Sequence, residues 1–180
     1  RIRFLEPMTA SILSNGRLRG AFGLAGGGAG AVGINRVVRA DGRVEELAQA
    51  LCQLGFSAVE ETAVGAQLVS DAYATAMREH QQSVLISSCC PTINLLVQKY
   101  HPSMLPYMAK VLTPAQAHCT LLKQRDPDCY TVFIGPCIAK KAETQDSSIT
   151  DNADYAITFG ELYALMRSKD MEFERAEKPY

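Results

Sequence analysis

Tyr130-Thr-Val-Phe-Ile134 runs directly into Gly135-Pro-Cys137, and this stretch decides the fold. Its β-branched and aromatic residues predict a buried strand, which the glycine and proline end just before the cysteine. The same order occurs earlier in the chain, where the apolar run Ser83-Val-Leu-Ile-Ser87 leads into Ser88-Cys-Cys-Pro91. The sequence therefore predicts two buried strands of one sheet, each followed by a cysteine loop.

Helical patterns separate these strands from one another. Apolar residues recur at helical spacing over 43–54 and over about 68–80, and Pro91 is favoured in the first turn of a helix that His101-Pro102 would end. Further helices are expected over 114–125 and around 162–166, and further strands over 56–60 and 155–159. This alternation predicts an α/β domain with a mostly parallel sheet flanked by helices.

The composition excludes several classes of protein. The chain has 180 residues, of which 47% are hydrophobic and 21% charged, as in soluble folded domains and unlike disordered chains. A formal net charge of -1 gives no overall attraction to nucleic acid. No apolar run reaches the ~20 residues of a membrane-spanning helix. We therefore expect neither a nucleic-acid partner nor a membrane span.

Glycines crowd residues 20–33, without a helical or strand period. We interpret residues 1–42 as a glycine-rich loop or linker and residues 43–180 as the α/β domain. Gly28-Ala-Gly-Ala-Val-Gly33 has the spacing of a dinucleotide fingerprint, but that motif needs a strand before it and a helix after it, and the β-branched run Ile34 to Val38 follows instead. The chain begins with Arg and ends without a closing motif, which suggests a piece of a longer protein with a truncated domain.

The six cysteines indicate reactive or metal-binding thiols rather than disulfides. Cys89 and Cys90 are adjacent, and neighbouring cysteines rarely bridge because the geometry strains the peptide between them. No signal peptide is visible, so a reducing, cytoplasmic setting is expected. In that setting, clustered thiols more often bind metal or take part in catalysis.

Both cysteine loops are expected at the carboxyl ends of strands, where binding sites of open α/β sheets form. A helix follows each loop, and the helix N-terminus favours a thiolate. Cys90 and Cys137 are therefore predicted metal ligands, with Cys89 left beside the metal to carry protons and Lys140 placed to donate hydrogen bonds to the metal's ligands. In the alternative interpretation the cysteines are structural, and Lys140, Lys141 and Glu143 lie on a solvated helix face.

Two motifs resemble those of the [FeFe]-hydrogenase catalytic domain. Ser87-Ser-Cys-Cys-Pro91 is similar to Thr-Ser-Cys-Cys-Pro-Gly-Trp, and Gly135-Pro-Cys-Ile-Ala-Lys-Lys-Ala-Glu143 is similar to Met-Pro-Cys-x-x-Lys-Lys-x-Glu. Gly65-Ala-Gln-Leu68 and Ala153-Asp-Tyr-Ala-Ile-Thr-Phe-Gly-Glu-Leu162 fit the flanking segments. The resemblance implies one of the two lobes of the iron-only hydrogenase catalytic domain, which hold the H-cluster, a [4Fe-4S] cube joined through cysteine to a diiron subcluster.

The resemblance also implies roles for individual residues. Cys90 and Cys137 match ligands of the cube, and Cys89 matches the catalytic thiol that transfers protons. Three further residues are expected to contact the cofactor: Ser88, Pro136 and Lys140, the last through a cyanide ligand. The implied reaction is reversible reduction of protons to dihydrogen, with a ferredoxin-type domain or protein as electron donor or acceptor. The family's third motif, Cys-x-x-x-Cys, is absent, so the H-cluster is expected to be complete only with the remainder of a longer chain, and the fragment alone to be inactive.

Several positions depart from the hydrogenase pattern. Thr92-Ile93 replaces Gly-Trp, Gly135 replaces Met, and Ala109 falls near a serine of the proton relay. Over 69–77 only Asp71 is acidic, where proton-conducting members carry glutamates. These departures favour the alternative of an iron–sulfur module that senses hydrogen or redox state, or relays electrons, without turnover. Whether the full-length protein is an enzyme stays open, and so does a purely structural α/β domain.

The remaining candidate ligands have weaker patterns. Cys52 lies among apolar residues of the first predicted helix and is expected in the core. His101, His118, Cys119 and Cys129 match no zinc spacing, so core or surface roles are favoured.

Overall fold

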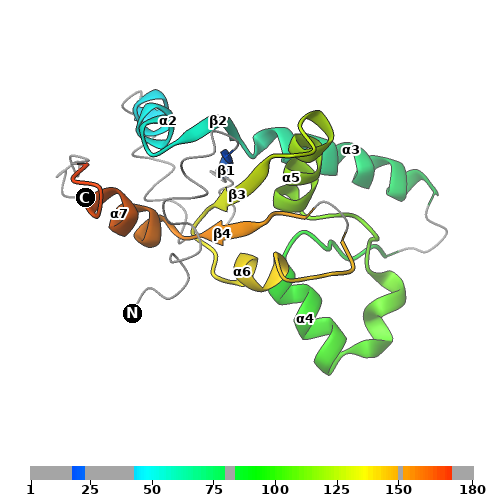
Figure 1. Cartoon of the computed structure of the whole chain (residues 1–180). Coiled ribbons are helices and arrows are strands. Elements are labelled where there is room, and N and C mark those ends of the chain that lie inside the picture. Colours follow the sequence, from blue (N-terminus) through cyan, green and yellow to red (C-terminus); the bar gives the residue numbers. More distant parts are fainter. Residues whose placement is uncertain (1–17, 23–42, 80–83, 150–151, 172–180) are drawn as a thin grey trace.

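The strands and helices of the computed structural model follow the sequence patterns closely (Figure 1). The structure describes residues 18–22, 43–79, 84–149 and 152–171. Its elements, in chain order, are β1 (Leu18–Phe22), α2 (Arg43–Gln53), β2 (Phe56–Glu61), α3 (Ala63–Glu79), α4 (Pro91–Tyr100), the 3₁₀ helix η3 (Pro102–Tyr107), α5 (Pro114–Arg125), β3 (Tyr130–Ile134), α6 (Ala139–Glu143), β4 (Tyr155–Ile157) and α7 (Phe159–Arg167). None of the helices within these ranges is long and apolar enough to cross a bilayer.

The four strands form one parallel sheet in the order β2-β1-β3-β4. The central strand β1 pairs with β2 on one side and with β3 on the other, so that Gly20 lies between Val59 and Val132. Because all strands are parallel, their carboxyl ends meet at one edge of the sheet. The predicted fold class, an α/β structure with a parallel sheet flanked by helices, is confirmed.

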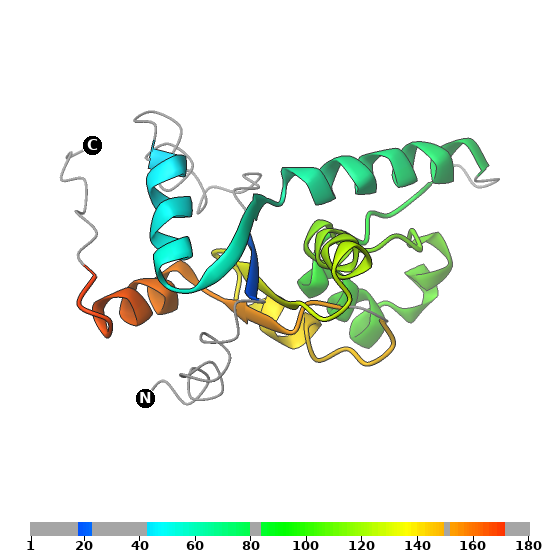
Figure 2. The same cartoon turned by 45° about the horizontal axis from the view of Figure 1, so that its top comes forward.

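Helices cover both faces of the sheet, as Figure 2 shows. Alternation along β3 sends Val132 and Ile134 to the face covered by α2 and α7, and Phe133 to the face covered by α5. The first face carries the larger buried cluster, which consists of Leu47, Ala50, Leu51, Leu54, Phe56, Val132, Ile134, Ile157, Leu162, Leu165 and Met166. This three-layer arrangement fixes β3, and with it the chain that leads to Cys137.

α3 and α5 pack closely at a glycine. A side-chain carbon added at Gly65 would lie 2.2 Å from the backbone oxygen of Pro114 and 2.7 Å from Cβ of His118. Gly65, Val69 and Tyr73 follow one another at helical spacing and form the covered stripe of α3. Tyr73 at the far end of this stripe reaches the first cysteine loop.

The structure overturns one predicted strand. The run 83–87 is not part of the sheet, since its described residues form only an isolated parallel bridge between Ile86 and Met108. The backbone of Ile86 bonds instead to its neighbours after η3, with its N–H donating to Tyr107 and its carbonyl accepting from Ala109. The backbone N–H and C=O groups of an apolar run form hydrogen bonds with whichever extended segment lies beside them. The sequence pattern does not identify that segment.

The structure also contains a strand within the segment interpreted as a loop or linker. Leu18–Phe22 forms β1 at the centre of the sheet, although Gly20 belongs to the glycine-rich stretch. Pairing of the backbone on both sides holds this strand, and glycine spacing carries no information on such pairing. The glycine motif from Gly28 to Gly33 lies outside the described residues.

Candidate metal centre

The first cysteine loop leads into α4. Cys90 is the N-cap residue, with an extended backbone (φ -110°, ψ 112°), and Pro91 occupies the first turn. The carbonyl of Cys90 accepts the first helical bond, from Asn94 N–H at 3.0 Å. The side chain of Cys90 is half-buried and that of Cys89 is exposed, so the adjacent thiols occupy different environments. The free N–H groups at this helix end favour a negatively charged ligand such as a thiolate.

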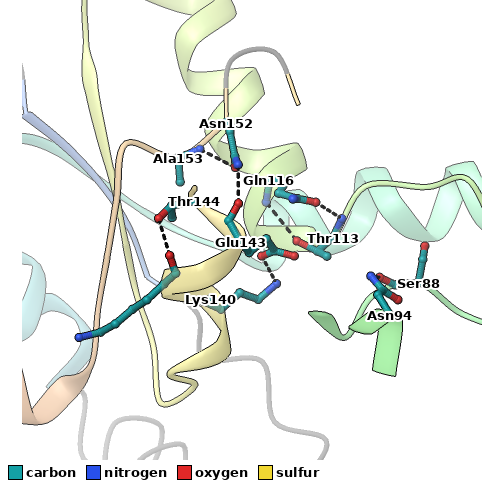
Figure 3. A network of polar contacts seen from close by, with 10 residues as sticks. Ser88, Asn94, Thr113, Gln116, Lys140, Glu143, Thr144, Asn152 and Ala153 are labelled. Carbon is teal, nitrogen blue, oxygen red and sulfur yellow. Dashed lines mark hydrogen bonds and ion pairs between the residues drawn. The ribbon is translucent and has the colours of Figure 1, made fainter. Parts of the chain in front are cut away.

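Ser88 fixes this loop through all three of its polar groups. Its N–H donates to the hydroxyl of Tyr73 on α3 at 2.7 Å, and its own hydroxyl donates to the carbonyl of Val111 at 2.7 Å. Its carbonyl accepts from the side-chain amide of Asn94 at 2.9 Å. Figure 3 shows Ser88 and Asn94 side by side. Three separate segments of the chain therefore hold the residue that precedes the cysteine pair.

Cys89 has a hydroxyl partner in the same loop. The hydroxyl of Ser87 donates to Sγ of Cys89 at 3.2 Å and accepts from the N–H of Cys89 at 3.4 Å. The hydroxyls of Ser87 and Tyr73 lie 3.1 Å apart. The exposed thiol thus ends a short series of hydroxyl groups that begins on α3.

The second cysteine loop continues directly from the sheet. The N–H of Gly135 donates to the carbonyl of Ile157 at 3.0 Å, which extends the pairing of β3 and β4 by one residue. A side-chain carbon at Gly135 would lie 2.7 Å from Cε1 of Phe133, so the phenyl ring fills the space that a larger residue would need. Pro136 and Cys137 follow, both exposed. Cys137 therefore follows a strand of the sheet, whereas the prediction that the Cys89–Cys90 loop also follows one is wrong.

Lys140 is paired within α6. Its ammonium donates to the carboxylate of Glu143 at 2.6 Å, and their side chains are only 12% and 7% exposed (Figure 3). The ammonium also lies 6.0 Å from the centre of the Phe133 ring. The alternative of a solvated helix face is therefore wrong for this pair. Lys140 and the phenyl ring that covers Gly135 form one group beside the second loop.

α6 is also tied to α7. Lys141 donates to Glu161, whose other carboxylate oxygen accepts from the N–H of Thr158 at 2.8 Å. Desolvation opposes the charge on Glu161, but the hydrogen bonds from Lys141 and Thr158 outweigh it and hold the pKa of Glu161 below its ordinary value.

The two loops border one cavity of about 250 Å³. Ser88 and Pro91, on either side of the cysteine pair, line it from one side, and Ala139, two residues after Cys137, lines it from the other. Polar side chains from α4, α5 with its N-cap, and α6 also line it, and Figure 3 draws all of them: Asn94, Thr113, Gln116 and Glu143. The side-chain oxygen of Asn94 is buried there without a hydrogen-bond partner. The structure thus brings residues beside the cysteine pair and the start of the helix after Cys137 to one cavity, whose lining does not include Cys89, Cys90 or Cys137 themselves.

The donor set at this site fits part of an iron–sulfur cluster. Thiolates are the ligands that such clusters require, and Cys89, Cys90 and Cys137 are all free. Across the described ranges, no group of three or more His, Cys, Asp or Glu side chains is arranged to hold a metal ion. The free thiols of Cys90 and Cys137 fit the kind of ligand that such a cluster takes.

The other cysteines take no part in this site. Cys119 and Cys129 are buried beside Phe133, and burial raises the pKa of Cys119 to about 12. His118 is fully buried and its Nε2 lies 3.2 Å from Glu60, whereas His101 is exposed. The expected core or surface positions are confirmed, with Cys119, Cys129 and His118 in the core and His101 at the surface. Cys52 is exposed, so its expected core position is wrong; it lies on the outer side of α2.

Sequence patterns missed several residues around the cavity. Thr113 and Gln116 form a capping box at the start of α5, and their spacing of three is a recognisable signal of it. Tyr73 and Asn94 carry no such signal. Their roles depend on where α3 and α4 meet the loop, which a single sequence does not encode in any local pattern.

Comparison with known proteins identifies relatives of two kinds. Residues 28–179 match the family described as "Iron only hydrogenase large subunit, C-terminal domain". The chain is 36% identical over 90 residues to the cytosolic Fe-S cluster assembly factor NAR1 of Kluyveromyces lactis, a match that covers 50% of this chain and 19% of that protein. NAR1 of Yarrowia lipolytica is 30% identical over 139 residues, with 67% and 28% covered. The periplasmic [Fe] hydrogenase large subunit of Nitratidesulfovibrio vulgaris is 30% identical over 102 residues, with 49% and 24% covered.

Solved structures share the fold. A structure concerned with oxygen inactivation of an [FeFe]-hydrogenase matches with a TM-score of 0.68 at 22% identity, over 91% of this chain and 45% of that one. An apo [FeFe]-hydrogenase HydA1 variant from Chlamydomonas reinhardtii matches with a TM-score of 0.65 at 23% identity, over the same shares. The chain spans less than a third of the length of these three curated relatives and under half of the two structures.

Proposed function

Because this chain belongs to the family of the iron-only hydrogenase large subunit, C-terminal domain, we propose that it supplies two ligands, Cys90 and Cys137, to a [4Fe-4S] cluster. The observation that carries the proposal is that one cavity is lined both by Ser88 and Pro91, on either side of the cysteine pair, and by Ala139, two residues after Cys137. The two remaining ligands would come from a further part of a longer protein. The family relationship supports this division, since the chain covers only a fraction of its relatives.

The residues of this chain would hold and orient the cluster. A [4Fe-4S] cluster supplies one-electron transfer when it is bound. Cys90 would bind from the N-terminus of α4, where backbone N–H groups favour the negative charge of a thiolate ligand. Cys137 would bind from the rigid end of β3. Lys140 would place positive charge beside the second loop, with Glu143 fixing its position.

We place the protein in the cytosol, in the assembly of iron–sulfur proteins, as the NAR1 relatives are named. A feature of α3 supports this role over hydrogen turnover. The side chain that α3 brings to the cysteine loop is the Tyr73 hydroxyl and not a carboxylate, while Asp71 is exposed and bonded to Gln67 at 3.0 Å. The resemblance implies glutamates on this helix in proton-conducting members, and residues 69–77 contain none. A ferredoxin-type domain or protein is the proposed electron partner.

Hydrogen turnover at a complete H-cluster is the second candidate. The specific observation in its favour is the free, exposed Cys89 thiol with its Ser87 hydroxyl partner, a group able to carry a proton beside a metal.

Iron and acid-labile sulfide analysis with EPR, on anaerobically reconstituted full-length protein, tests the cluster. We expect Cys90→Ala and Cys137→Ala each to abolish the cluster signal. Cys52→Ala is the matched control, because Cys52 is exposed and lies outside the cavity, and it should keep the wild-type signal. A full cluster signal in Cys90→Ala and Cys137→Ala would contradict the proposal.

Two measurements separate the assembly role from hydrogen turnover. They are hydrogen evolution and infrared spectroscopy of the protein expressed together with hydrogenase maturation enzymes. For an assembly factor we expect a cluster without hydrogen evolution and without infrared bands of iron-bound CO and cyanide. Turnover together with those bands would establish the second candidate.

A further inference from the structure

Tyr73 connects α3 to the residue that precedes the cysteine pair. Its oxygen accepts from the N–H of Ser88 at 2.7 Å, and it lies 3.0 Å from the Ser88 hydroxyl. Since the single hydrogen of the Ser88 hydroxyl goes to the carbonyl of Val111, Tyr73 is the donor where its hydroxyl bonds to that of Ser88, and the Ser87 hydroxyl at 3.1 Å competes for the same hydrogen. Tyr73 therefore contacts Ser88 at two atoms, as the acceptor of its N–H and beside its hydroxyl.

This double contact has no substitute among the described neighbours. Ser88 is 6% exposed, so its backbone N–H cannot turn to bulk water, and Tyr73 is the acceptor in the structure. A buried N–H without an acceptor is costly, so the loop would move if the phenol oxygen were removed. Ser87, on the other side, shares contacts with both Tyr73 and Sγ of Cys89.

We propose that Tyr73 is the positioning residue of the first cysteine loop and sets the directions of the Cys89 and Cys90 side chains. The inference rests on the proposed function, because positioning matters only if the loop binds a cluster. The side-chain amide of Asn94 links the Ser88 carbonyl to α4, and the Tyr73 hydroxyl links the Ser88 N–H to α3. Loss of the Tyr73 oxygen would free one end while Cys90 stays at its helix.

Hydrogen exchange of the cluster-free full-length protein tests the restraint directly. In Tyr73→Phe we expect the Ser88 amide to exchange about tenfold faster or more, because its acceptor is gone. Tyr100→Phe is the matched control, since Tyr100 is 71% exposed and should leave that exchange rate unchanged. In Ser88→Ala the backbone N–H keeps its acceptor, so this variant should show a much smaller increase. Unchanged exchange in Tyr73→Phe would overturn the proposal.

EPR line shape and midpoint potential of the reconstituted cluster distinguish positioning from simple structural support. We expect Tyr73→Phe to retain iron and sulfide but to change both the line shape and the potential, and Tyr100→Phe to change neither. Faster exchange of the Ser88 amide with an unchanged spectrum and potential would overturn the positioning role. A wild-type protein without any cluster would refute the proposed function instead, and the exchange experiment would still decide whether Tyr73 restrains the loop.

Discussion

Side chains hold the first cysteine loop, whereas the second loop continues the backbone pairing of the sheet. Around Ser88, bonds reach Tyr73 on α3, Val111 before α5 and Asn94 on α4. Around Gly135, the backbone extends the β3–β4 ladder and the Phe133 ring closes over the glycine. The two proposed ligands therefore have different mechanical supports. The first can shift with the helices, and the second moves only with the sheet.

The largest effect is expected where α3, the helix that supports the first loop, packs against α5. Gly65→Ala places a carbon 2.2 Å from the Pro114 carbonyl oxygen, and neither helix backbone can yield cheaply. We expect a loss of roughly 3 kcal/mol or more of unfolding free energy, measured by urea denaturation. Gly160→Ala is the control, because the nearest atom lies at 4.0 Å, and its stability should not fall. Equal urea midpoints for the two variants would show that α3 and α5 can separate without penalty.

The next effect concerns the second loop. Gly135→Ala forces the Phe133 ring from its place, and we expect a loss of about 1–3 kcal/mol in the same experiment. Adding Phe133→Leu should relieve the clash, so the double variant should lose less than the sum of the single losses. Strictly additive losses would mean that the ring does not determine which residue fits at 135.

A smaller effect is expected at the α4 end of the first loop. Asn94→Ala removes the amide that donates to the Ser88 carbonyl, and we expect a loss of about 1 kcal/mol. Thr92→Ala, at an exposed position of the same helical turn, is the control and should change stability little. Thermal unfolding of both variants checks this, and a loss at Thr92 as large as at Asn94 would argue against the specific contact.

The smallest effect depends on pH and concerns the α6–α7 link behind the second loop. The pKa of Glu161 is lowered in the folded protein, so its charge contributes stability that is present above its unfolded pKa and is lost as pH falls through the folded value. Glu161→Gln should therefore lower stability at pH 7 by up to about 1 kcal/mol, and the difference should shrink as pH falls below 4.5. Glu79→Gln, at an exposed carboxylate of α3, is the control. A difference that grows toward acid pH would reverse the assigned sign.

The same comparison explains what the sequence could predict. The second loop follows from a local pattern, in which β-branched residues, glycine and proline lead to a cysteine, and the structure has β3 at its predicted bounds. The first loop has a similar pattern, but its apolar run pairs with Met108 and not with the sheet. Its anchors, Tyr73 and Asn94, act through tertiary contacts that no periodicity encodes.

The central strand β1 shows the same limit for the fold. Gly20, considered by itself, indicates a loop. Residues 18–22 form a strand because they pair with β2 on one side and β3 on the other. The fold class was predictable because alternation of helices and strands is a property of the whole chain, whereas strand order is a property of pairings between distant segments.

The position of β1 has a consequence for biosynthesis. Leu18 pairs with Tyr130, so the middle of the sheet is translated long before one of its two neighbours exists. At ribosomal speeds this delay amounts to about 6 to 20 seconds, during which β1 has at most β2 as a partner. The nascent chain therefore carries an open strand edge while α3, α4 and α5 emerge, and that edge is a template for wrong association. We expect the closing of β3 onto β1 to be the slow step that completes the sheet, and the cysteine of the second loop to reach its place only after it.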